Sequence, residues 1–115
     1  MNDNNFRSVQ LPHHRLVAYS QALLLLGAVR AAGLRDATLR DHALRSAKSA
    51  CLNTAEGAGR VSRPDKARCF AIARAEACEA AAAVEIAAAA GDAGSALEVL
   101  RVADRLVALL TGLIR

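Results

Sequence analysis

The chain has 115 residues, a length typical of one domain, and 54% of them are hydrophobic, which is enough to build a core. Only 3% are aromatic, and the few prolines and glycines argue against disorder and against a β-sandwich. Charge is uneven: residues 1–74 carry 12 Lys and Arg against 5 Asp and Glu, whereas residues 75–115 carry 3 against 6, so the first part favours an acidic or polyanionic partner.

Several features bear on where the protein acts. The stretch Met1–Gln10 is polar and lacks the apolar segment of a secretory signal. The longest uncharged run, residues 16–29, is shorter than the roughly 20 apolar residues that span a membrane. The three cysteines form no CxxC pair and no cluster with histidine. We therefore expect a cytoplasmic protein with reduced thiols and no membrane association.

The first predicted helix begins near Pro12, because proline is favoured at the first helical position, and it ends near Gly33. We expect residues 1–10, which precede it, to be flexible. One face of this helix is marked by apolar residues at helical spacing: Leu16, Tyr19, Leu23 and Leu26.

The second predicted helix begins after Asp36 or Thr38, both of which are good N-cap residues. We expect Gly57 or Gly59 to stop it, because glycine adopts the left-handed cap conformation without strain. Its exposed side should hold three basic residues: Arg40, Arg45 and Lys48.

The third predicted helix begins at a clear start signal, in which Ser62 serves as the N-cap and Asp65 follows three residues later. It is rich in alanine and runs to about Ala90. Its few large apolar residues are Phe70, Ile72, Val84 and Ile86.

The fourth predicted helix follows a turn at residues 91–95 and repeats apolar residues at helical spacing. These are Val99, Val102, Leu106, Leu109 and Leu113, with Leu100, Val107, Leu110 and Ile114 beside them. Helices of this length joined by short turns pack as antiparallel neighbours. The sequence therefore predicts an all-α fold, an up-down-up-down antiparallel four-helix bundle, in a single domain over residues 1–115.

A motif lies where the second predicted helix ends. Asn53 and Glu56 are three residues apart on one helix face, and Arg60 follows in the turn. We expect Asn53 and Glu56 to fix the turn between the second and third helices. With residues of the third helix, the motif resembles that of the large-subunit ribosomal RNA intervening-sequence proteins, small bacterial four-helix bundles. The residues that carry this resemblance include Asn53, Glu56, Gly57, Phe70 and Glu79.

The resemblance implies an assembly and a set of partners. Members of the family look like four-helix bundles that form homopentamers, and most have no established biochemical activity. A relative, the accessory variability protein of diversity-generating retroelements, is a basic pentamer that binds nucleic acid and a reverse transcriptase. The resemblance therefore implies a homo-oligomer, with RNA or DNA and a nucleic-acid enzyme such as a reverse transcriptase as candidate partners.

No serine, histidine or glycine motif of an enzyme is present, so we expect no catalytic residues, no metal and no cofactor. The leading hypothesis is a non-enzymatic RNA-binding accessory protein with a basic surface. Its candidate residues are Arg40, Arg45, Lys48, Arg60, Arg63, Lys66, Arg68 and Arg74. The alternatives are a protein-interaction scaffold that uses the fourth helix, and a metal-dependent enzyme that uses Glu56, Glu76 and Glu79 with a histidine.

Overall fold

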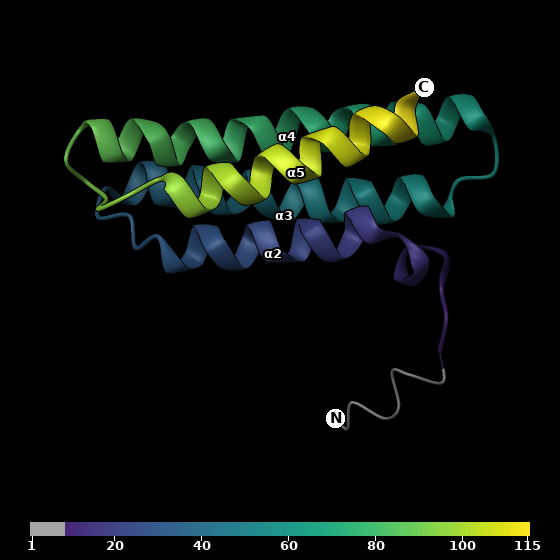
Figure 1. Ribbon diagram of the computed structural model, residues 1–115, viewed down its shortest axis with the longest axis horizontal. Helices are drawn as coiled ribbons and strands as arrows, with labels where there is room; N and C mark the ends of the chain where they lie inside the picture. The colour runs from purple at the N-terminus through teal and green to yellow at the C-terminus, as the bar shows by residue number, and fades with distance from the viewer. Residues whose placement is uncertain (1–8) are drawn as a thin grey trace.

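The computed structural model describes residues 9–115, and within this range it contains a short 3-10 helix and four α-helices but no strand (Figure 1). These elements are η1 (Pro12–Arg15), α2 (Val17–Ala31), α3 (Ala37–Gly59), α4 (Arg63–Ala89) and α5 (Leu97–Ile114). The predicted all-α fold with four helices is confirmed. The predicted flexible stretch, 1–10, lies almost wholly outside the described residues.

Two helices begin where the sequence predicts, and each start is fixed by a side-chain cap. The carboxylate of Asp36 accepts a hydrogen bond of 2.9 Å from the backbone N–H of Leu39 at the start of α3. The hydroxyl of Ser62 accepts one of 3.2 Å from the backbone N–H of Asp65 at the start of α4. Each cap satisfies a donor that the first turn of a helix leaves without a partner.

The first predicted helix is wrong in its opening turn, because Pro12 begins the separate element η1. The backbone N–H of Leu11 donates to Nδ1 of His14, and the N–H of His14 donates back to the carbonyl of Leu11, each over 3.0 Å. These bonds close a tight 3-10 turn. Leu16 then has an extended backbone, with φ −93° and ψ 118°, so α2 starts afresh at Val17.

The predicted reason for the end of α3 is also wrong. The helix runs through Gly59, and among residues 9–115 only Gly33 and Gly91 have positive φ. Gly57 serves a different purpose: a Cβ atom there would lie 2.6 Å from the ring of Phe70 on α4. Glycine is therefore needed at this position so that the ring of Phe70 can lie against the backbone of α3.

The four helices run alternately up and down along the bundle (Figure 1). α2 packs beside α3 and α5, and α4 packs beside the same two helices, so that α3 and α5 lie diagonally. At one end, the backbone N–H of Arg35 donates to the carbonyl of Asp92 over 2.8 Å and joins the two loops. The predicted up-down-up-down order is confirmed.

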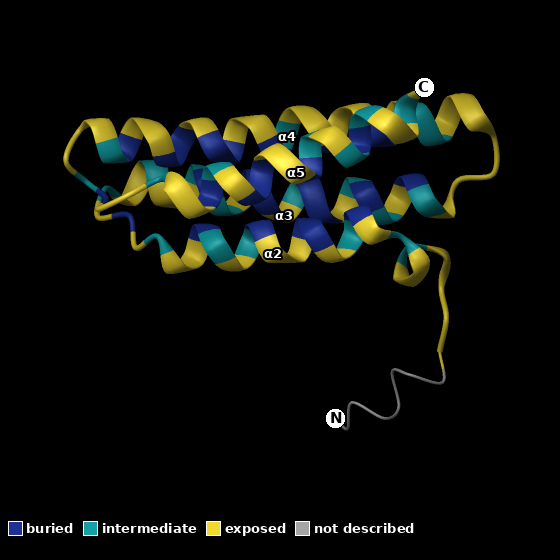
Figure 2. Ribbon diagram, viewed as in Figure 1, coloured by how far each residue is buried: buried dark blue, intermediate teal, exposed yellow. Residues whose placement is uncertain are grey.

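The core combines alanines from α4 with larger aliphatic residues from α5 (Figure 2). The buried alanines of α4 are Ala73, Ala77, Ala80, Ala81, Ala83 and Ala87. In α5, Leu106 and Leu110 are fully buried, whereas Leu113, which we predicted in the buried stripe, is 38% exposed. Leu110 lies one helical turn after Leu106 and takes that place in the core.

Candidate nucleic-acid interface

Three of the predicted basic residues, Arg40, Arg45 and Lys48, are exposed on α3. Arg45 and Lys48 point outward because the alanines that α3 buries against the core, Ala43 and Ala47 among them, occupy the opposite face. Arg40 lies near the start of α3, where its Nη1 donates to the carbonyl of Leu34 over 3.4 Å. A shallow hollow of about 420 Å³ lies on this outer surface. Its lining residues are Asp41, Leu44, Arg45, Lys48, Ser49, Leu52 and Asn53.

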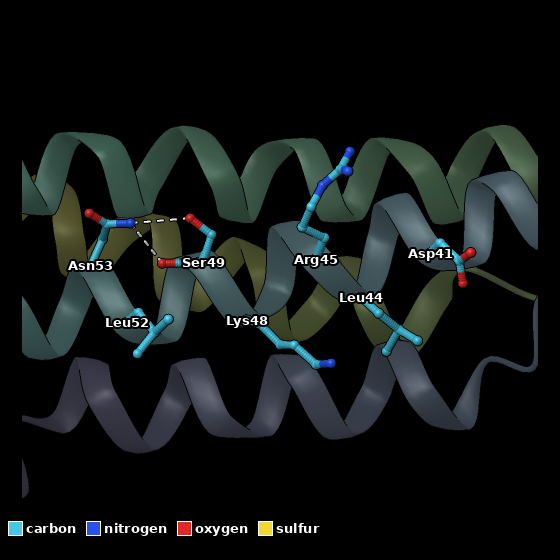
Figure 3. A pocket seen from close by; sticks show the side chains of 7 residues that line it. All are labelled: Asp41, Leu44, Arg45, Lys48, Ser49, Leu52 and Asn53. Atoms are coloured by element: carbon cyan, nitrogen blue, oxygen red, sulfur yellow. Dashed lines mark hydrogen bonds between the residues drawn. The ribbon is translucent and has the colours of Figure 1, made fainter.

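Figure 3 shows how the side chains of this hollow are arranged. Lys48 extends toward α2 and Arg45 toward α4, so the two charges stand on either side of the axis of α3. Arg45 lies 3.4 Å from Nδ1 of His42, and among the described residues Lys48 has no hydrogen bond or ion pair. These cations are therefore free to meet an anionic ligand, and Asp41 is the one carboxylate in the lining.

Asn53 belongs to the same hollow and takes no part in the turn after α3. Its amide Nδ2 donates to the carbonyl of Ser49 over 2.9 Å and to the hydroxyl of Ser49 over 3.1 Å (Figure 3). Both bonds stay within one turn of α3. The role that the sequence suggested for Asn53, fixing the turn to the next helix, is wrong, because its amide reaches back along α3.

Glu56 does connect α3 to α4. One of its carboxylate oxygens pairs with Arg60 over 2.9 Å, and the other accepts a weak hydrogen bond of 3.6 Å from the thiol of Cys69. The hydrogen bond that Arg60 donates to Glu56 raises the pKa of the Arg60 guanidinium, and Cys69 adds to this effect. Arg60 thus carries a charge that Glu56 largely neutralises.

Two further basic residues bind the ends of helices. Nζ of Lys66 donates to the carbonyls of Gly57 and Ala58 over 3.4 and 2.9 Å, which satisfies acceptors at the end of α3. Arg63 donates to the backbone carbonyl of Arg115 at the end of α5. Both residues hold the bundle together at the end where α3 turns into α4.

The last two predicted residues lie on α4. Nε of Arg74 donates to the hydroxyl of Thr111 over 2.9 Å, which places Arg74 in the groove between α4 and α5. Arg68 is exposed and makes no hydrogen bond or ion pair with any described residue. The eight predicted residues therefore divide: Arg45 and Lys48 line the hollow on α3, and Arg40 lies on the same helix outside this lining.

A contact between His42 and Glu79 could not be found from the sequence, because the residues are far apart along the chain. Nε2 of His42 lies 3.2 Å from the carboxylate of Glu79, which also accepts a hydrogen bond of 3.5 Å from Ser46. The neighbouring carboxyl of Glu76, and then the imidazole of His42, lower the pKa of Glu79 below its usual 4.5.

The described part of the chain holds no group of three or more His, Cys, Asp or Glu residues that could bind a metal ion. The hypothetical metal site needed Glu56, Glu76 and Glu79 close to one histidine. His42 approaches Glu79, whereas Glu56 is bound to Arg60 and Cys69 near the end of α3. The arrangement gives no support to metal-dependent catalysis.

One protein-family model matches most of the chain. The sequence profile described as "23S rRNA-intervening sequence protein" matches residues 28–111, which run from the second half of α2 nearly to the end of α5. The chain belongs to this family. No curated protein matches the chain. Across residues 9–115, no helix is both long enough and apolar enough to span a membrane.

The range of the match refines the resemblance seen in the sequence. The residues named for that resemblance lie between Asn53 and Glu79, whereas the profile begins at Ala28 and includes most of α5. The Asn53–Arg60 motif and the basic residues of α3 lie inside the matched range. The element η1 and the first turns of α2 lie outside it.

Proposed function

We propose that this protein is a non-enzymatic, homo-oligomeric four-helix bundle that binds RNA through the basic outer surface of α3. The observation that carries the proposal is the position of Arg45 and Lys48, which are both exposed and line one hollow on the outer surface of α3. Lysine and arginine side chains that neutralise phosphates provide salt-dependent binding without regard to sequence. A homo-oligomer would repeat this surface and raise the overall affinity.

The chemistry of the hollow favours structured RNA over an unpaired strand. Single strands are bound largely by stacking on aromatic rings, and the lining of the hollow contains none. Helical RNA is bound mostly by contacts to phosphates and 2′-hydroxyl groups. Lys48 and Arg45 suit the phosphates, and Ser49 and Asn53 offer polar atoms to hydroxyl groups. The name of the family also concerns ribosomal RNA, which supports the choice of RNA.

The alternative function is a protein-interaction scaffold whose binding surface is on the fourth predicted helix, α5. The outward residues of α5 include Glu98, Arg101, Asp104 and Arg105, which mix both signs of charge. Such a surface is typical of a face that is simply in contact with water. A nucleic-acid enzyme such as a reverse transcriptase as a further partner stays a prediction that the family resemblance motivates.

A pair of charge-matched variants tests the proposal. Affinity for a structured RNA hairpin is measured by filter binding over a series of salt concentrations. The Arg45→Ala, Lys48→Ala variant should bind more weakly, and its plot of log affinity against log salt should be less steep by about two, one for each lost phosphate contact. The control is Arg101→Ala, Arg105→Ala, which removes the same charge from α5.

The control variant should bind nearly as tightly as the unaltered protein. Equal loss in both variants would mean that net charge, and not the surface of α3, governs binding. Failure of the unaltered protein to bind at low salt, or an affinity indifferent to salt, would overturn the proposal.

A further inference from the structure

The outward face of α4 is largely apolar, although it also exposes Arg74, Cys78, Glu79 and Glu85. Between residues 71 and 89, exposed alanines and isoleucines form a stripe along the helix. These residues are Ala71, Ile72, Ala75, Ala82, Ile86 and Ala89. Ile86 is 56% exposed and borders a groove of about 280 Å³ between α3 and α4, which His42 and Glu79 also line.

The outward face of α2 is apolar as well, but its larger side chains differ in shape. Its exposed residues are Val17, Ser20, Leu23, Leu24, Gly27 and Arg30. Leu24 is 58% exposed. Gly27 lies in a hollow of about 290 Å³ that Arg30 and Ala31 also line, and a Cβ atom at Gly27 would meet nothing within 4 Å.

The two faces are complementary in shape. Leu23 and Leu24 project from α2, whereas α4 presents a flat row of alanines and the groove beside Ile86. Ile86 in turn projects, and α2 offers the hollow at Gly27. Small side chains let two helices approach closely, and projecting side chains then fit between those of the neighbouring helix. At 1.5 Å per residue, the stripe of α4 is roughly 28 Å long and α2 roughly 22 Å, so the stripe is long enough to take the whole of α2.

The two faces also carry opposite charges. Between residues 71 and 89, α4 has three glutamates and one arginine, Arg74, which is turned toward Thr111 of α5. α2 has no acidic residue, and its outward face carries Arg30. Pairing α4 with a second α4 would oppose like charges, as would pairing α2 with a second α2. Pairing α2 with α4 brings Arg30 near glutamates.

We propose that the outward face of α2 in one copy of the chain packs on the outward face of α4 in a second copy. The inference rests on the homo-oligomer proposed above and specifies its interface. Each copy then keeps one α2 face and one α4 face for different neighbours, so the contact is head-to-tail and repeats into a ring or a filament. Because α2 and α4 lie diagonally, the basic surface of α3 between them stays open to RNA.

A mixing experiment tests this interface. The Gly27→Glu variant fills the hollow on α2 without a clash inside its own subunit, and Ala82→Glu places a large side chain in the exposed stripe of α4. Each variant alone should be a single subunit of 12.0 kDa in size-exclusion chromatography with light scattering. An equal mixture should form a dimer and stop there, because one intact α2 face and one intact α4 face remain between the two variants.

Circular dichroism first checks that both variants keep the helicity of the unaltered protein. Each outcome of the mixing experiment then supports or contradicts the α2–α4 interface. Retention of the full assembly by either variant, or a mixture that stays monomeric, would overturn the α2–α4 interface while the proposed oligomer stands. An unaltered protein that is itself monomeric would remove the oligomer and this interface together. RNA binding by α3 is measured separately, and a monomeric protein should still bind RNA, with the lower affinity of a single surface.

The thiol of Cys78 gives a second readout, because it is exposed on α4 within the proposed interface. In the assembled protein it should be protected from a maleimide, and in the Gly27→Glu variant, where α4 is unaltered, it should react freely. Cys51 and Cys69 are buried and should react slowly in both. Equal reactivity of Cys78 in both proteins would contradict the interface.

Discussion

Helices α5 and α4 both contribute to the core, but they distribute their apolar residues differently. Along most of its length, α5 has large aliphatic residues such as Leu106 inside and charged residues such as Arg105 outside, and its exposed leucines, Leu97 and Leu113, lie near its two ends. α4 has alanines on both sides, and it leaves Ile72 and Ile86 exposed. A charged outer face such as that of α5 is typical of a helix that faces water, and the exposed apolar residues along α4 are the reason for proposing that a second copy covers it.

The two helices also stabilise the bundle by different means. α5 fills space with side chains, whereas α4 contributes little side-chain volume and depends on the close approach of its backbone to α3. The contact of Phe70 with Gly57 shows how small the separation is, since no Cβ atom fits there. Removing side-chain volume should therefore lower the free energy of unfolding most in α5. Adding side-chain volume should lower it most where α3 meets α4.

The largest effect should come from shortening a core residue of α5. Leu106 is fully buried, so Leu106→Ala should lower the free energy of unfolding by about 2–5 kcal/mol, since it leaves a cavity. The exposed neighbour Arg105 is the control, and Arg105→Ala should change it by less than about 0.5 kcal/mol. Urea unfolding at one fixed protein concentration measures both. Similar values for the two variants would show that α5 is not divided as described.

The next effect should come from adding a single methyl group where α3 meets α4. Gly57→Ala should lower the free energy of unfolding by about 1–3 kcal/mol, because the new Cβ atom overlaps the buried ring of Phe70. Gly59→Ala is a matched control two residues away, where the new atom meets nothing within 4 Å.

The Gly59→Ala variant should be unchanged or gain up to about 1 kcal/mol, since alanine loses less backbone entropy than glycine in a helix. Both variants are compared by urea unfolding. Equal tolerance of alanine at the two positions would contradict the close approach of α3 and α4.

The smallest effect on stability should come from the contact of Glu79 on α4 with His42 on α3. Because Glu76 and His42 lower the pKa of Glu79 below 4.5, the contact stabilises the fold at higher pH and is lost as the pH falls through the lowered value. Glu79→Gln should remove this part of the pH dependence of unfolding. An NMR titration of the carboxyl carbon measures the pKa directly, and a value at or above 4.5 would contradict the contact.

Local signals explain most of what the sequence predicted correctly. The caps at Asp36 and Ser62 depend on residues three positions apart, and the spacing of apolar residues in α5 depends on the helix period alone. These interactions do not need the rest of the molecule. For this reason the number, the order and most starts of the helices could be predicted.

The parts that could not be predicted depend on how helices are rotated against one another. An alanine-rich helix such as α4 gives no pattern that distinguishes its inner face from its outer one. The contact of His42 with Glu79 and the contact of Gly57 with Phe70 both join α3 to α4 across this ambiguity. The partners of the basic residues also depend on how the helices are rotated, as Arg74 shows by its contact with Thr111 on α5.

Native mass spectrometry with a structured RNA hairpin tests most directly the claim that copies assemble while the surface of α3 stays free for RNA. The unaltered protein should appear as a homo-oligomer with RNA bound. The Arg45→Ala, Lys48→Ala variant should appear as the same oligomer with little RNA. Single subunits in the first spectrum, or equal RNA occupancy in both spectra, would contradict the account.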